Sequence, residues 1–183
     1  MERLDAMDYF DYTYKHNYIE FSSSIYKVGT YTYNWHGGTE IFILLKGRVE
    51  MSCNDKVFTM EPLDVVIISP QVGHSTLALE EDVVAFVIQV GNEFYQQYDS
   101  DFGMYEFVIR SDASTRRNEF FTTLRHHAAM TMLLMNKGEN SIHRMWIEHH
   151  YLSLVGDVFR EFDPVKKIHE NARPGDIKPA TFD

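Results

Sequence analysis

With 183 residues, of which 44% are hydrophobic, the chain is long enough to bury one substantial core, which excludes a disordered polypeptide. The chain has 17 Lys and Arg and 27 Asp and Glu, which gives a net charge of −10. This charge excludes strong nucleic-acid binding by these residues alone, because such binding requires basic side chains that neutralise phosphates. A single cysteine, Cys53, excludes an intramolecular disulfide, and without a secretory signal or an apolar run of about 20 residues we expect a cytoplasmic protein outside the membrane.

The first part of the chain has the pattern of an all-β domain. We assign residues 1–16 to an N-terminal arm and residues 17–111 to a β-barrel. The barrel segment consists of short runs rich in Val, Ile, Phe, Tyr and Thr, separated by Gly, Asn, Asp or Pro. Its predicted strands cover residues 18–22, 24–34, 39–45, 48–53, 56–60, 64–69, 75–79, 83–90 and 104–109.

Beyond residue 111 the apolar residues recur at spacings of three and four, which predicts helices. Two helices over residues 112–163, the second capped by Ser141, should form an antiparallel hairpin. Their apolar stripes are Phe120, Leu124, Ala128, Thr131 and Met135, then Met145, His149, Leu152, Val155, Phe159 and Phe162. Such stripes pack against the barrel or form a dimer seam, and both alternatives stay open. Residues 164–183, rich in Pro and Gly, are predicted to be a linker.

The polar residues that could carry chemistry lie in two segments of the barrel. Residues 34–40 read Asn-Trp-His-Gly-Gly-Thr-Glu and resemble the first cupin motif, with Asn34 in place of its first histidine. Strand alternation places Asn34 and His36 on one face. The aromatic residues on the opposite face, which should point outward, are Tyr31, Tyr33 and Trp35.

The second segment, residues 62–74, resembles the second cupin motif and ends in His74, which should face the first cluster. Leu63 replaces a customary glycine, and Ala78 replaces an asparagine. These departures disfavour a metal enzyme. Three good ligands for a divalent ion nevertheless remain, namely His36, Glu40 and His74.

Together, the segments Trp35-His36-Gly37-Gly38-Thr39-Glu40-Ile41 and Pro70-Gln71-Val72-Gly73-His74 and the paired helices resemble the sensor domain of AraC-type transcription regulators. The resemblance covers nearly the whole chain. It implies a mainly β fold, a cupin-like double-stranded β-helix (jelly-roll) barrel followed by a two-helix antiparallel hairpin. It also implies a sugar or other small metabolite as effector, a homodimer formed through the helices, no catalytic residues and no required cofactor. DNA would be bound only by a further C-terminal domain with helix-turn-helix units, beginning where this chain stops.

We therefore predict a ligand site made of Asn34, His36, Glu40 and His74, with polar groups setting the orientation of the ligand. Two alternatives use the same residues. His36, Glu40 and His74 could hold a metal in a small cupin enzyme, a sugar isomerase or dioxygenase, or His36 and Glu40 could form only a buried polar pair.

Another alternative is a barrel filled by its own side chains, which would leave only oligomerisation. The large residues that could fill it are Phe42, Phe58 and Phe86. The adjacent pairs His126-His127 and His149-His150 are more typical of solvated or interfacial histidines than of a site, and Cys53 is more typical of a core residue than of a nucleophile.

Overall fold

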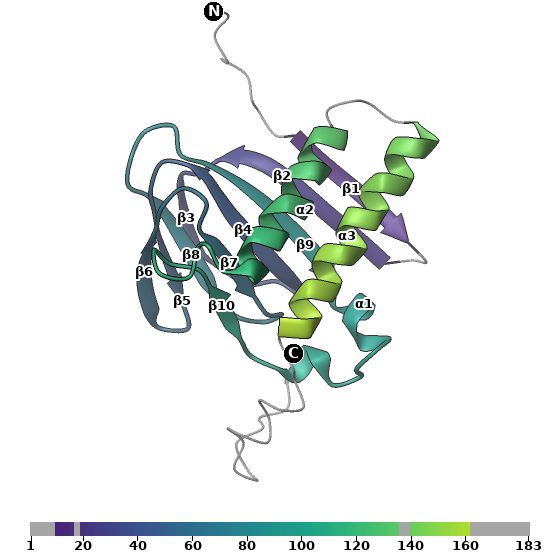
Figure 1. Cartoon of the computed structure of the whole chain (residues 1–183). Coiled ribbons are helices and arrows are strands. Elements are labelled where there is room, and N and C mark those ends of the chain that lie inside the picture. Colours follow the sequence, from purple (N-terminus) through teal and green to yellow (C-terminus); the bar gives the residue numbers. More distant parts are fainter. Residues whose placement is uncertain (1–9, 17–18, 136–139, 162–183) are drawn as a thin grey trace, which may run out of the picture.

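The structure is a computed structural model that describes residues 10–16, 19–135 and 140–161. In this part of the chain, ten strands form two antiparallel sheets (Figure 1). The six-stranded sheet consists, in spatial order, of β1 (Phe10–His16), β2 (Ile19–Lys27), β9 (Val84–Gly91), β4 (Gly38–Lys46), β7 (Val65–Ile68) and β10 (Val108–Arg110). The four-stranded sheet consists of β3 (Thr30–Asn34), β8 (His74–Ala78), β5 (Val49–Cys53) and β6 (Lys56–Met60).

The helical part follows the strands. Two short helical segments, α1 (Asn92–Gln96) and η1 (Phe102–Met104), precede β10, and two long helices, α2 (Glu119–Met135) and α3 (Ser141–Glu161), lie side by side across the six-stranded sheet (Figure 1). The predicted fold class is confirmed: the chain is mainly β, a double-stranded β-helix barrel followed by a two-helix antiparallel hairpin. None of the helices described is long and apolar enough to cross a bilayer.

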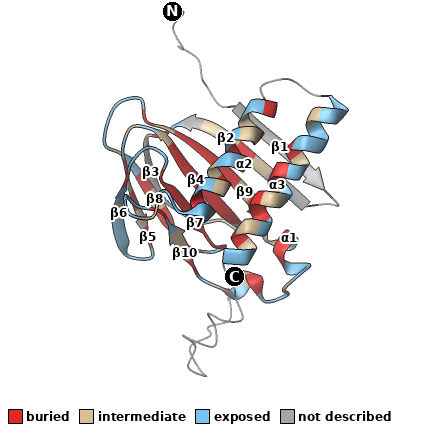
Figure 2. Ribbon diagram, viewed as in Figure 1, coloured by how far each residue is buried: buried red, intermediate tan, exposed pale blue. Residues whose placement is uncertain are grey.

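The six-stranded sheet is the wall between two hydrophobic cores, and β4 shows why. Ile41 and Ile43 pack toward the helices, whereas Phe42 and Leu44 pack into the barrel. Because side chains alternate along a strand, a strand buried on both faces needs a continuous apolar run, which β4 supplies. Figure 2 shows the resulting buried strands beneath α2 and α3.

The apolar stripes predicted only part of the face through which the helices meet the sheet. All of the first predicted stripe is buried or half-buried in α2. The second stripe is wrong for Met145, which is 59% exposed, and for the exposed His149 and Leu152. The buried residues of α3 are Ile147, His150, Tyr151, Leu154, Val155 and Val158. A helix with apolar residues on several faces has no unique apolar stripe, so the elements that pack against it determine which face is buried.

The cap of α3 also differs from the prediction. The side-chain oxygen of Asn140, rather than that of Ser141, accepts hydrogen bonds from the backbone N–H groups of Ile142 and His143, at 3.0 and 2.9 Å. Asn and Ser are about equally good N-cap residues, so the sequence alone did not show which of the adjacent residues Asn140 and Ser141 caps the helix.

The strands differ from the prediction by more than two residues in three places. The chain passes from one sheet to the other at residues 28–29, not at Ser23. The Val28 N–H still donates to the Val83 carbonyl next to β9, whereas the Gly29 carbonyl already accepts the N–H of Ala78 in β8. Residues 10–16, assigned to the arm, form β1 beside β2, and Met104 lies in η1. The rest of the arm, residues 1–9, and the linker, residues 164–183, lie outside the described residues.

Candidate functional site

His36, Glu40 and His74 come together at one end of the barrel, where strands of both sheets meet. Glu40 lies on β4, in register with Gln89 of β9. His74 begins β8 and pairs with Cys53 of β5. His36 lies between β3 and β4, and its carbonyl accepts the backbone N–H of Gln71 at 3.0 Å. The turn before β8 is thereby tied to the loop that carries His36.

The Glu40 carboxylate is the centre of the cluster. Its Oε2 lies 2.9 Å from Nε2 of His36 and accepts a hydrogen bond of 3.0 Å from the Gln89 amide, while Oε1 lies 3.7 Å from Nε2 of His74. One potential ligand atom from each of the three residues lies within 4.8 Å of the others. Glu40 and His74 are buried, with 6% and 7% exposure, and His36 is half-buried.

Backbone carbonyls orient both imidazoles. Nδ1 of His36 lies 2.8 Å from the Gly38 carbonyl, and Nδ1 of His74 lies 3.1 Å from the Val72 carbonyl. Because a carbonyl only accepts, each Nδ1 carries a proton, and each Nε2 is turned toward Glu40. Histidines that bind metals or polar ligands are commonly fixed by such a second hydrogen bond.

Glu40 and His36 shift each other's pKa. Burial opposes ionisation of Glu40, but the hydrogen bond from His36, the charge of His74 and the Gln89 amide outweigh it and lower the pKa of this carboxyl. Burial likewise lowers the pKa of the His36 imidazole, and the hydrogen bond and charge of Glu40 outweigh it, so that the pKa is raised. The contact therefore favours the ionised form of both groups, a buried carboxylate and an imidazole that holds its proton more tightly than usual.

Cys53 lies beside the cluster without joining it. Burial first, and then the negative charge of Glu40, raise the pKa of its thiol to about 12. A thiol that stays protonated near neutral pH is a poor nucleophile, so Cys53 serves as a core residue.

Asn34, the fourth predicted ligand residue, pairs with His74 through the backbone of β3 and β8, but its side chain does not join the cluster. It is exposed, and its side-chain oxygen accepts the backbone N–H of Trp35 at 2.9 Å. The register of β3 with β8 shifts between Tyr31 and Asn34, so the simple alternation that placed Asn34 beside His36 does not hold there. The neighbouring aromatic residues Tyr33 and Trp35 are each 63% exposed, as expected, and the side chain of Tyr31 lies outside the described part.

Gln89 is the site residue that the sequence analysis missed. It is the one polar residue in the otherwise apolar run of β9, and that interruption was the available signal. Next to it, Gly38 allows β4 and β9 to approach closely, because a Cβ at Gly38 would lie only 2.7 Å from the Val90 carbonyl oxygen.

The remaining barrel interior is apolar. Phe42 lies in this core and Phe58 packs against it, whereas Phe86 belongs to the core under the helices. The other buried residues of the barrel core are Val28, Leu44, Val49, Met51, Cys53, Met60, Val66, Ile68, Val72, Val83, Ala85 and Val87. A polar cluster above an apolar floor can orient a small ligand and contact its apolar parts.

Comparisons with known proteins gave a family match and several similar structures. The family model of the AraC-like ligand-binding domain matches residues 16–136, and no curated protein matches the chain. A cupin domain of Cnp3 from Schizosaccharomyces pombe is similar at a TM-score of 0.41 and 13% identity, over 52% of this chain and 73% of that one. A cupin family protein with a double-stranded β-helix fold from Methanocaldococcus jannaschii is similar at a TM-score of 0.40 and 12% identity, over 53% of this chain and 93% of that one. A mutant oxalate decarboxylase of Bacillus subtilis is similar at a TM-score of 0.36 and 18% identity, over 42% of this chain and 22% of that one. Since the family model matches more than half of its length, the chain belongs to the AraC-like ligand-binding domain family.

Proposed function

We propose that the barrel binds a small polar effector at His36, Glu40 and His74, and that binding controls transcription in the cytoplasm through a DNA-binding domain elsewhere in the full-length protein. The observation that carries the proposal is the buried Glu40 carboxylate, toward which both imidazoles turn Nε2. Membership of a ligand-binding family supports the same role.

A sugar or another hydroxyl-bearing metabolite fits the chemistry of this cluster. A hydroxyl can donate to the free lone pairs of Glu40 and accept from an imidazole N–H, and the Gln89 amide adds another donor. Effector binding would then shift the population between two arrangements of the barrel and the segments that contact it.

Thermal shift with a panel of sugars and other small metabolites tests the proposal. A bound effector at about 100 times its Kd should stabilise the fold by about 2.7 kcal/mol, and His74→Ala should abolish that gain. His149→Ala is the matched control, because His149 is an exposed histidine on α3. The proposal fails if no compound shifts the melting temperature, or if His36→Ala and His74→Ala bind as the unmodified chain does.

A second candidate is a divalent metal at the same three residues, with enzymatic activity of the isomerase or dioxygenase type. The favouring observation is that both Nδ1 atoms are engaged by carbonyls, which leaves two Nε2 atoms and one carboxylate, a donor set suited to several transition metals. A bound ion would supply Lewis-acid polarisation of a substrate oxygen. We place a binding domain first, because the family model is that of a ligand-binding domain.

Metal analysis separates the two candidates. Protein purified without chelators should contain substoichiometric Mn, Fe, Ni and Zn if the site is a plain effector site, and adding these ions should not change the melting temperature. Stoichiometric metal that is lost in His74→Ala would instead establish the second candidate.

We further propose that the hairpin mediates homodimerisation. Large apolar side chains remain exposed on α2 and α3, and they include Leu133 (57%), Ile142 (63%), Met145 (59%) and Trp146 (48%). Exposed apolar patches commonly mark interfaces. Light scattering should give twice the monomer mass for the unmodified chain and the monomer mass for Met145→Glu. A monomeric unmodified chain would refute this part.

A further inference from the structure

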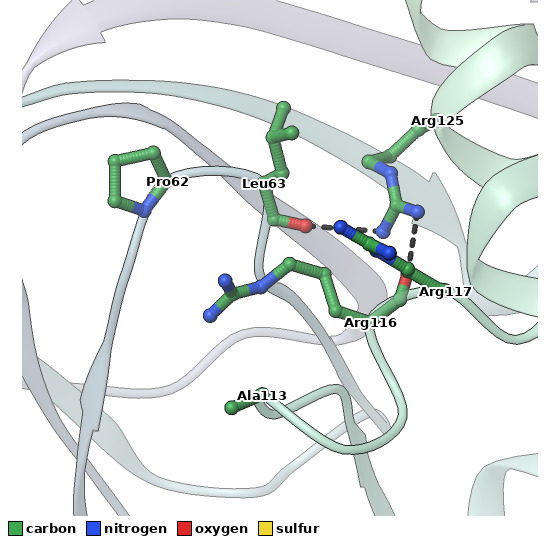
Figure 3. Close-up of a pocket in the computed structure, with 6 residues that line it drawn as sticks. All are labelled: Pro62, Leu63, Ala113, Arg116, Arg117 and Arg125. Atoms are coloured by element: carbon green, nitrogen blue, oxygen red, sulfur yellow. Dashed lines mark hydrogen bonds between the residues drawn. The ribbon is translucent and has the colours of Figure 1, made fainter.

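A surface pocket of about 440 Å³ lies on the barrel side of α2, outside the site described above (Figure 3). Its lining comes from three places: the turn before β7, the segment before α2, and α2 itself. The residues are Pro62, Leu63, Ala113, Arg116, Arg117 and Arg125. Three arginines around one pocket are unusual in a chain whose net charge is −10.

The pocket is separated from the barrel cluster by the length of β4. Glu40 lies near the start of this strand, whereas the Leu44 carbonyl accepts the N–H of Leu63 at 2.7 Å. Four residues of extended strand span about 13 Å. A ligand in this pocket would therefore occupy a second site, and the inference does not rest on the proposed effector site.

The three arginines differ in how their charges are balanced. Arg116 pairs with Asp64 at 2.7 Å and with Glu61 at 3.3 Å. Within the described residues, no carboxylate lies within 4.0 Å of the side chain of Arg117 or Arg125. Neither guanidinium is thus directly paired with a carboxylate, although the charge of Asp64 acts on Arg125.

Arg125 is held in place by neutral groups instead. Its guanidinium donates to the Leu63 carbonyl at 3.1 Å, to the Thr122 hydroxyl at 3.2 Å and to the Arg116 carbonyl, as Figure 3 shows for the two carbonyls. Burial, followed by the charge of Arg116, lowers the pKa of Arg125. A partly buried cation beside another cation is stabilised by an anion.

The other wall of the pocket is apolar and has an unusual backbone. Leu63 is 51% exposed and has a φ of +74°, a left-handed conformation that is costly for a leucine. Pro62 and Ala113 continue this wall. The pocket therefore offers a small apolar surface next to the two unpaired guanidinium groups.

We propose that this pocket binds the phosphate group of a small phosphorylated metabolite, held by Arg117 and Arg125, with the apolar part of the metabolite against Leu63. A phosphate monoester carries nearly two negative charges at neutral pH, which matches two unpaired guanidinium groups better than a carboxylate does. The planar fork of arginine also suits phosphate oxygens. Because the lining combines barrel and α2 residues, the bound group would connect the two.

Calorimetry with inorganic phosphate on the whole chain, at constant ionic strength, tests the proposal. Saturable binding should be weakened about tenfold by Arg117→Gln, which removes one set of charge-assisted hydrogen bonds. Arg144→Gln is the matched control, since Arg144 is an exposed arginine on α3, and it should bind phosphate as the unmodified chain does. Acetate, with a single charge, should bind more weakly than phosphate.

Three results would overturn the proposal. The first is the lack of saturable phosphate binding, and the second is equal binding by Arg117→Gln and the unmodified chain. The third is loss of phosphate binding in His74→Ala, because that would place the anion in the barrel site. Unchanged melting temperatures of Arg117→Gln and Arg144→Gln would show that the comparison concerns folded protein.

Discussion

Two groups of histidines lie in this chain, one in the barrel and one between α2 and α3, and they differ in their partners. In the barrel, Nε2 of His36 meets the Glu40 carboxylate at 2.9 Å. Between the helices, Nδ1 of His127 meets Nδ1 of His150 at 3.0 Å, and one imidazole must donate to the other. Nε2 of the buried His150 has no hydrogen-bond partner among the described residues.

The pKa values of His36 and His150 move in opposite directions for this reason. Glu40 overcomes burial and raises the pKa of His36. Burial, assisted by the charges of His127, His149 and His126, lowers the pKa of His150 to about 4. A buried carboxylate thus favours a charged histidine, whereas burial among other imidazoles favours a neutral one.

The largest expected effect comes from removing the carboxylate. Glu40→Ala removes the buried carboxylate that is the hydrogen-bond partner of His36 and Gln89, and near pH 6 it should lower the free energy of unfolding by about 3–5 kcal/mol. Urea denaturation measures this loss. Glu80→Ala is the control, since Glu80 pairs with Arg48 on the surface and should cost little. Equal losses in the two variants would show that Glu40 is no more than a surface charge.

The second prediction concerns acid. Because the pKa of His150 is lower in the folded chain than its usual 6.5, protonation favours the unfolded state. Stability should be complete above pH 6.5 and fall as the pH drops toward about 4, by about 3 kcal/mol over the whole window.

Urea denaturation at several pH values, with His150→Leu, checks the origin of this loss. The variant has no imidazole at this position and should lack that part of the pH dependence. His149→Leu changes the exposed neighbour and should keep it. If His150→Leu loses as much stability in acid as the unmodified chain, burial of His150 is not the cause.

The third prediction is the reverse case, at alkaline pH. The pKa of His36 is raised in the folded state, so its contribution is complete below 6.5 and is lost as the pH rises through the raised pKa. The loss should be about 1 kcal/mol, because His36 is half-buried and keeps its Gly38 bond. His36→Gln should remove this alkaline loss in urea titrations, and a variant that retains it would assign the loss to another group.

The two groups also differ in how far the sequence predicted them. Motif spacing predicted the convergence of His36, Glu40 and His74, because each position is set by strand register and a short turn. It did not predict the place of Asn34, since a register shift near a strand end interrupts side-chain alternation. Gln89 came from a strand distant in sequence, and only the pairing of β9 with β4 brings it to Glu40.

The helical group was harder to predict for a physical reason. Adjacent residues on a helix point about 100° apart, so one histidine of each pair faces inward and the other outward. The structure buries His150 and half-buries His127, while His126 and His149 are exposed. Which member faces inward depends on the packing of α3, and its apolar pattern predicted the wrong face for Met145 and His149.

The smallest expected effect tests whether any nearby carboxylate can act as Glu40 does. Asp157 is 4.0 Å from Nε2 of His127, and its Oδ1 pairs with the exposed Arg160 at 3.0 Å. Distance weakens its effect on His127, whose pKa is lowered by burial although the charge of Asp157 opposes this. Asp157→Asn, measured by urea denaturation beside Glu40→Ala, should change stability by no more than about 0.5 kcal/mol. A loss as large as that of Glu40→Ala would mean that the helical histidines also depend on a charged partner, and the contrast between the two groups would then lie in solvent access alone.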